Sequence, residues 1–134
     1  MRESKLYSED QLKAFVDIDE TICFYEDKRI YELAIPNIDN INKINKLKKE
    51  GWHITYYTAR GGASKIDYTE LTTKQLNEWG CIFDDLVVGY KEDIRPFFAI
   101  SSCFVFPSYR EGFPNVVLEA ASMELPCIVT NING

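Results

Sequence analysis

Short apolar runs alternate with longer segments of helical periodicity along this chain. The apolar runs are rich in β-branched and aromatic residues and are bounded by polar residues, which is typical of strands buried in a parallel sheet. They lie at 14–18, 53–58, 85–89, 103–108 and 126–131. Between them, apolar residues recur with the helical period and predict helices at 38–51, 68–80, 94–102 and 113–124.

This order of strands and helices predicts the fold class. Strands that alternate with helices form a parallel sheet with helices packed on its faces. We therefore expect an α/β protein with a three-layer, Rossmann-like parallel sheet. No low-complexity segment, flexible linker or internal repeat interrupts the pattern, and GGASK at 61–65 is the most loop-like stretch.

The composition limits the possible partners. Of the 134 residues, 46% are hydrophobic, which is enough for one domain with a core. The formal net charge of −6 argues against a nucleic acid as partner, because binding its backbone needs a basic face. No apolar run reaches the roughly 20 residues that cross a bilayer, and the N-terminal segment has no signal-peptide core. We expect a cytoplasmic protein without a membrane partner.

Cysteine and histidine usage supports the same compartment. The four cysteines are widely spaced and form no CxxC pair, which is typical of reduced thiols. The only histidine, His53, begins a predicted strand. A zinc cluster and a Ser-His or Cys-His hydrolase are therefore disfavoured.

Polar side chains follow three of the predicted strands. Asp17 and Asp19 close the first strand, Thr58 closes the second and Lys91 follows the third. The carboxyl ends of parallel strands share one edge of the sheet, where ligands bind. One carboxylate could attack phosphorus while the other transfers a proton. Mg²⁺ would relieve the repulsion between them, and the hydroxyl and ammonium groups would bind phosphate oxygens. This pattern predicts phosphoryl transfer.

The segments FVDIDETI, YYTAR and VVGYK resemble motifs of the haloacid dehalogenase (HAD) superfamily. The resemblance covers about residues 13–91 and is greatest to small phosphatases encoded in capsule and polysaccharide gene clusters. It implies that Asp17 is the nucleophile and Asp19 the acid/base. It also implies that Mg²⁺ is held by the Asp17 carboxylate and the Asp19 main-chain carbonyl, and that Thr21 steadies the turn.

The resemblance leaves some roles open. Lys91 is the favoured third-motif lysine because it follows a strand, and Lys65 is the alternative. Arg60 is either a phosphate or substrate contact or a solvated loop residue. The interval from Thr21 to Thr58 is short, so we expect little or no cap domain. The resulting hypothesis is Mg²⁺-dependent phosphomonoester hydrolysis of a small phosphorylated sugar or related metabolite.

The fourth HAD motif is absent, and the segment FPSYREGFPNVVLEAAS points to another family. It resembles the nucleotide-sugar-binding domain of retaining glycosyltransferases of the family 4 type, which have two Rossmann-like domains. The resemblance implies that Glu111 lies near the donor sugar and that Glu119 contacts the ribose. The start of the following helix, after Gly112, would face the diphosphate, where free amides favour an anion.

Two parts of the chain are therefore expected. Residues 1–91 would form a HAD-like phosphatase core, and residues 92–134 a glycosyltransferase-like fragment packed onto the same sheet. In that arrangement CFVF at 103–106 would replace the missing fourth strand and bring Glu111 toward the metal position. The alternative to a phosphatase is a non-catalytic nucleotide-sugar-binding fragment or an inactive fusion relic. A final strand with an open edge also raises the hypothesis of a homodimer.

Overall fold

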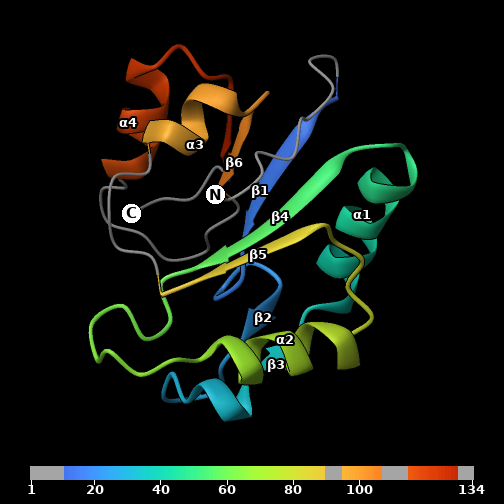
Figure 1. Ribbon diagram of the computed structural model, residues 1–134, viewed down its shortest axis with the longest axis vertical. Helices are drawn as coiled ribbons and strands as arrows, with labels where there is room; N and C mark the ends of the chain where they lie inside the picture. Colours follow the sequence, from blue (N-terminus) through green and yellow to red (C-terminus); the bar gives the residue numbers. More distant parts are fainter. Residues whose placement is uncertain (1–10, 90–94, 107–114, 130–134) are drawn as a thin grey trace, which may run out of the picture.

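The computed structural model describes residues 11–89, 95–106 and 115–129. Within them, a three-stranded parallel sheet forms the centre of the fold (Figure 1). Its strands are β1 (Lys13–Asp17), β4 (His53–Thr58) and β5 (Asp85–Val88), in the order β1-β4-β5. Because Asp17 pairs in register with Tyr57, the carboxyl ends of β1 and β4 lie side by side.

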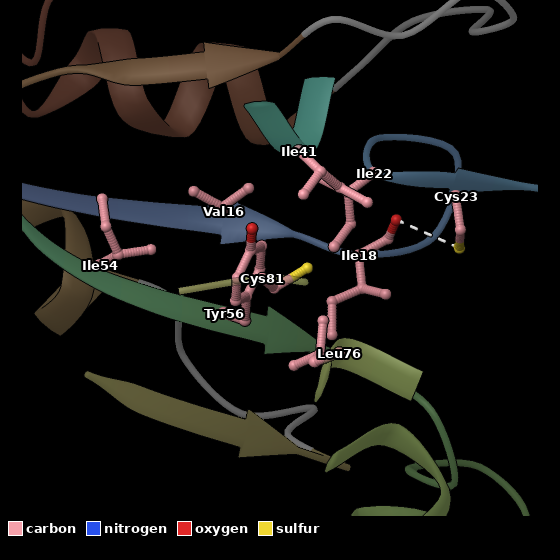
Figure 2. Packing of buried hydrophobic residues seen from close by; sticks show 9 residues of the cluster. All are labelled: Val16, Ile18, Ile22, Cys23, Ile41, Ile54, Tyr56, Leu76 and Cys81. Atoms are coloured by element: carbon pink, nitrogen blue, oxygen red, sulfur yellow. Dashed lines mark hydrogen bonds between the residues drawn. The ribbon is translucent and has the colours of Figure 1, made fainter. Parts of the chain in front are cut away.

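Two helices cover one face of this sheet and build the main core. They are α1 (Ile38–Lys49) and α2 (Thr69–Glu78). The side chain of Asn37 caps α1 by accepting a hydrogen bond from the Asn40 backbone at 3.2 Å. The core consists of Val16, Ile18, Ile22, Cys23, Ile41, Ile54, Tyr56, Leu76 and Cys81 (Figure 2). Each large aliphatic side chain buried there contributes about 1.5–3 kcal/mol.

The other face of the sheet packs against aromatic residues from the second half of the chain. Side chains alternate between the faces of a strand, so Phe15 and Tyr57 point away from the main core. Their rings meet Phe97 of α3 (Arg95–Ile100) edge to face, with centroids 5.4 and 5.6 Å apart. This contact makes α3 the third layer of the fold and confirms the predicted α/β architecture.

The remaining elements form a second, smaller unit. They are β6 (Phe104–Phe106), α4 (Asn115–Ser122) and β7 (Cys127–Val129). The strands β6 and β7 are parallel partners, and α4 lies between them in sequence. Their small core contains Phe98, Ala120 and Leu125. In the described part of the chain, β6 contacts β1 but forms hydrogen-bonded strand pairs only with β7. Residues 103–106 therefore do not join the central sheet as the expected fourth strand.

Three short elements were not anticipated from the sequence. They are β2 (Cys23–Phe24), the 3₁₀ turn η1 (Tyr31–Leu33) and β3 (Ile35–Pro36). The two strands pair in antiparallel fashion beyond the carboxyl end of β1. No helix among the described residues is both long and apolar enough to span a bilayer.

Candidate functional site

The turn after β1 places three acidic residues at the edge of the sheet. The Ile18 carbonyl accepts hydrogen bonds from the backbones of Thr21, Ile22 and Cys23 at 3.0–3.3 Å, which folds the chain back on itself. Glu20 adopts a left-handed backbone conformation with φ of 62° to close this turn. Asp17 and Asp19 therefore lie on either side of the buried Ile18.

Asp19 is fully engaged by protein groups. Thr58 donates a hydrogen bond to one carboxylate oxygen at 2.9 Å. Arg60 donates to the other oxygen through Nε at 3.0 Å and Nη2 at 2.8 Å, and the Tyr25 hydroxyl donates to it as well. Burial would raise the pKa of Asp19, but the hydrogen bonds from Arg60 and Tyr25 and the charge of Arg60 outweigh burial and hold it below its ordinary value. Asp19 is therefore an ionised partner of Arg60.

Arg60 lies in the interior and not on a solvated loop. Its residue surface is 1% exposed. Besides Asp19, the guanidinium donates to Gln75 at 2.6 Å and Thr72 at 3.3 Å, both on α2, and it lies 4.9 Å from the centre of the Tyr31 ring. These contacts join α2 and η1 to the turn after β1, so the arginine positions Asp19.

Asp17 stands outside this network. Its carboxylate accepts a hydrogen bond from the Ile18 backbone, and the residue remains open to solvent through the cavities that it lines. Burial among protein atoms and the negative charge of Asp19 raise the pKa of Asp17 to about 7. The two aspartates of one motif therefore have opposite electrostatic surroundings.

Two cavities meet at this edge of the sheet. A polar cavity of about 180 Å³ is lined by Asp17, Asp19, Glu20, Thr21, Arg29, Ala59 and Phe106. A second cavity of about 200 Å³ is mainly apolar and is lined by Phe15, Asp17, Thr21, Tyr57, Phe97, Phe98, Ser101, Cys103, Phe104, Val105, Phe106 and Val116. The carboxyl ends of β1, β4 and β6 therefore converge on one composite space.

Not all of the other site residues predicted from the sequence lie at these two cavities. Thr58 is completely buried beside Asp19, and Thr21 lines both cavities. Lys65 lines a separate, open cavity beside Gly61. Lys91 and Glu111 lie outside the described residues.

The acidic turn after β1 is where the predicted Mg²⁺ would have to bind. Among the described residues, no group of three or more His, Cys, Asp or Glu residues could hold a metal ion. The Asp19 carboxylate pairs with Arg60 and Glu20 pairs with Arg29, so Asp17 is the carboxylate of the polar cavity that has no ionic partner among the described residues. Mg²⁺ bound by Asp17 and the Asp19 main chain stays a prediction.

Several contributors to the site were missed in the sequence. Tyr25, Thr72 and Gln75 all contact Arg60, and Phe97, which packs against the sheet, lines the apolar cavity. The helical periodicity placed Thr72 and Gln75 on α2. No pattern in the sequence indicated that their side chains would meet an arginine.

Comparison with known proteins identifies the family. The model of the family described as glycosyl transferases group 1 matches residues 38–134, so the chain belongs to this family. Three curated relatives are similar over shorter segments. One is the UDP-Gal:alpha-D-GlcNAc-diphosphoundecaprenol alpha-1,3-galactosyltransferase of Escherichia coli, 51% identical over 49 residues. The others are the capsular polysaccharide biosynthesis glycosyltransferase CapM of Staphylococcus aureus (41% over 49 residues) and the putative teichuronic acid biosynthesis glycosyltransferase TuaC of Bacillus subtilis (42% over 41 residues).

The relatives are much longer than the matched segments. The first two matches cover 37% of this chain and 13% of each relative, and the third covers 31% and 10%. A crystal structure of a target protein from Vibrio cholerae shares the fold, with a TM-score of 0.52 over 84% of this chain and 98% of that chain. At 19% sequence identity, this likeness concerns the fold alone.

These findings correct the prediction of function. The sequence hypothesis of a phosphomonoester hydrolase is wrong, because the family match and the curated relatives are all glycosyltransferases. The resemblance of residues 92–134 to glycosyltransferases is supported, whereas the comparisons give no support to a HAD phosphatase. The site has a physical reason for the same conclusion, since Asp19 is held ionised by Arg60 and is poorly suited to donate a proton.

Proposed function

We propose that this chain contributes nucleotide-sugar binding to a glycosyltransferase of polysaccharide biosynthesis. The observation that carries the proposal is the family match over residues 38–134. The names of the relatives refer to a UDP-galactose-dependent transferase, to capsular polysaccharide and to teichuronic acid. A uridine diphosphate sugar is therefore the donor to test first.

The β6-α4-β7 unit is the part of the structure that supports donor binding. Its parallel strands flank α4, as in the open sheets that bind nucleotides beyond the carboxyl ends of their strands. The first turn of a helix presents backbone N–H groups without intrahelical partners, which favour an anion such as a diphosphate. We place the diphosphate near the start of α4.

Glu119 is the described side chain best suited to the ribose. It is exposed on α4, about one turn after the helix begins at Asn115, and its carboxylate pairs with no described cation. A carboxylate near a nucleotide-binding turn can accept hydrogen bonds from ribose hydroxyls. In our proposal the sugar of the donor then extends from the diphosphate toward the carboxyl end of β6.

Calorimetric titration of the chain with UDP-galactose and with UDP tests the proposal. We expect both ligands to bind, and we expect Glu119→Gln to weaken both about tenfold, because a charged hydrogen bond to the ribose is lost. Glu78→Gln, at an exposed acid at the end of α2, is the matched control and should leave both affinities unchanged.

Absence of UDP and UDP-galactose binding would contradict the proposal, and so would equal effects of the two substitutions. Repeating the titration with magnesium and with a chelator tests whether a divalent ion takes part in donor binding. A need for Mg²⁺ would support such an ion, and identical affinities would count against it.

A further inference from the structure

The polar and apolar cavities at the carboxyl ends of β1, β4 and β6 are two halves of one space. They share Asp17, Thr21 and Phe106 as lining residues. We propose that this composite cavity binds a neutral pyranose, the sugar part of the donor. Hydroxyl groups of the sugar would contact Asp17 and Thr21, and its C–H face would pack on Phe106. The inference rests on the proposed function and adds a sugar subsite formed by the first half of the chain.

The charges of the polar half favour a neutral ligand that donates hydrogen bonds. Asp19 is neutralised by Arg60, and Glu20 forms an ion pair with Arg29 at 3.7 Å. Among the described lining residues, Asp17 is left as the carboxylate without an ionic partner. The ionised form of this carboxyl would repel a phosphate group. Sugar hydroxyls can donate hydrogen bonds to it and bring no charge.

Thr21 adds a second polar side chain to the cavity, on a backbone that the protein holds in place. The Thr21 carbonyl accepts a hydrogen bond from the Asn40 side chain at 2.8 Å, and the Thr21 backbone N–H bonds to Ile18 at 3.3 Å. The backbone at this position is therefore held at both ends of the residue. Asp17 and Thr21 line the same cavity, so a carboxylate and a hydroxyl are both available to the hydroxyls of a sugar ring.

The apolar half supplies the surface that a sugar ring needs on its other side. The faces of aromatic rings carry negative charge density and attract the partly positive C–H groups of a pyranose. Phe106 stacks on Phe104 with centroids 5.9 Å apart, and Phe97 is wedged edge to face against Tyr57. These ring contacts restrict the side chains, so the aromatic wall is formed before a ligand arrives.

The position of the cavity fits the proposed donor site. Phe106 is the last residue of β6, the strand that precedes α4 in the family segment. A diphosphate near the start of α4 would lie beyond the carboxyl end of β6, the same strand end at which Phe106 lines the cavity. The sugar attached to that diphosphate would then lie beside the composite cavity.

NMR titrations with methyl β-galactopyranoside, UDP and UDP-galactose test this inference. We expect the galactoside to shift the backbone signals of Thr21 and Phe106, with weak affinity of about 1–10 mM. UDP-galactose should bind about tenfold more tightly than UDP. Asp17→Asn and the isosteric Thr21→Val should each weaken galactoside binding about tenfold and reduce the advantage of UDP-galactose, without changing UDP binding more than about twofold. Asp27→Asn, at an exposed loop residue, is the control and should have no effect.

The outcomes separate this inference from the proposed function. If UDP binds but the galactoside causes no shifts and UDP-galactose binds no more tightly, the sugar subsite is refuted and donor binding stands. If the galactoside binds with the expected dependence on Asp17 while UDP does not bind, the sugar subsite is supported and the proposed function fails. Unchanged galactoside binding in both site variants would also refute the subsite. Circular dichroism of each variant confirms that a loss of binding is not a loss of folding.

Discussion

Replacing Asp17 by asparagine tests the electrostatic description of the site through the stability of the fold. The pKa of the Asp17 carboxyl rises from 3.8 to about 7 on folding, because burial and the charge of Asp19 disfavour ionisation. A carboxyl whose pKa is raised in the folded state is destabilising once it ionises, so the penalty grows as pH rises between these two values. The Asn side chain keeps the shape and cannot ionise. We therefore expect Asp17→Asn to be more stable than the natural chain above about pH 7, with little difference below about pH 4.

The size of the effect follows from the same two pKa values. A difference of one in pKa corresponds to about 1.4 kcal/mol, so the change from 3.8 to about 7 sets a ceiling of about 4 kcal/mol. Asp17 is also open to solvent through the cavities, and water screens part of this penalty. After that reduction, we expect a gain of about 1–2 kcal/mol in the free energy of unfolding at high pH.

Urea unfolding of both proteins at about pH 4.5 and about pH 8.5 measures this gain. The difference in free energy of unfolding should be clearly larger at the higher pH. Asp27→Asn, in the exposed loop between β2 and η1, is the control, and its effect should be the same at both pH values. A pH-independent effect of Asp17→Asn, or a loss of stability at high pH, would refute the reasoning.

Two further predictions concern the neighbouring loop. Arg60→Met should cost about 3–5 kcal/mol in urea unfolding, because it leaves a buried carboxylate without its ionic partner, whereas Arg29→Met breaks an exposed pair and should cost less than about 1 kcal/mol. Similar losses would contradict the buried pair. Gly61→Ala should lower the melting temperature much more than Gly51→Ala. Both glycines have positive φ, but a Cβ on Gly61 would lie 1.9 Å from the Ile66 carbonyl oxygen, while one on Gly51 meets nothing within 4 Å.

The longer helices and strands could be predicted from the sequence because their patterns are local. The strand expected at 53–58 is β4, and the helix expected at 38–51 is α1 with a shorter end. A strand needs only a run of apolar residues, and a helix only a repeated apolar face. The short β2 and β3 strands have neither, since each has two residues and their pairing depends on the turn that brings them together. They could not have been predicted from periodicity.

The gathering of polar residues at the strand ends was also accessible, because it follows from topology. Parallel strands bring Asp17 and the carboxyl end of β4 to one edge whatever the protein does there. The apolar cavity was not accessible, because Phe97 reaches it from α3, whose position relative to the sheet no local pattern determines.

The partners of each polar group decided its chemistry, and these partners are scattered along the chain. The TAR sequence left Arg60 as either a ligand contact or a solvated residue. It is not solvated, because α2 supplies the acceptors Thr72 and Gln75 that draw its guanidinium inside. The buried Arg60 holds Asp19 in its ionised form. Asp17 has no such ionic partner among the described residues, and its pKa is raised. A spacing of two residues fixed where the carboxylates lie, and the tertiary contacts fixed what each of them can bind. For this reason a sugar with hydroxyls to donate suits Asp17 better than the phosphate that the motif alone suggested.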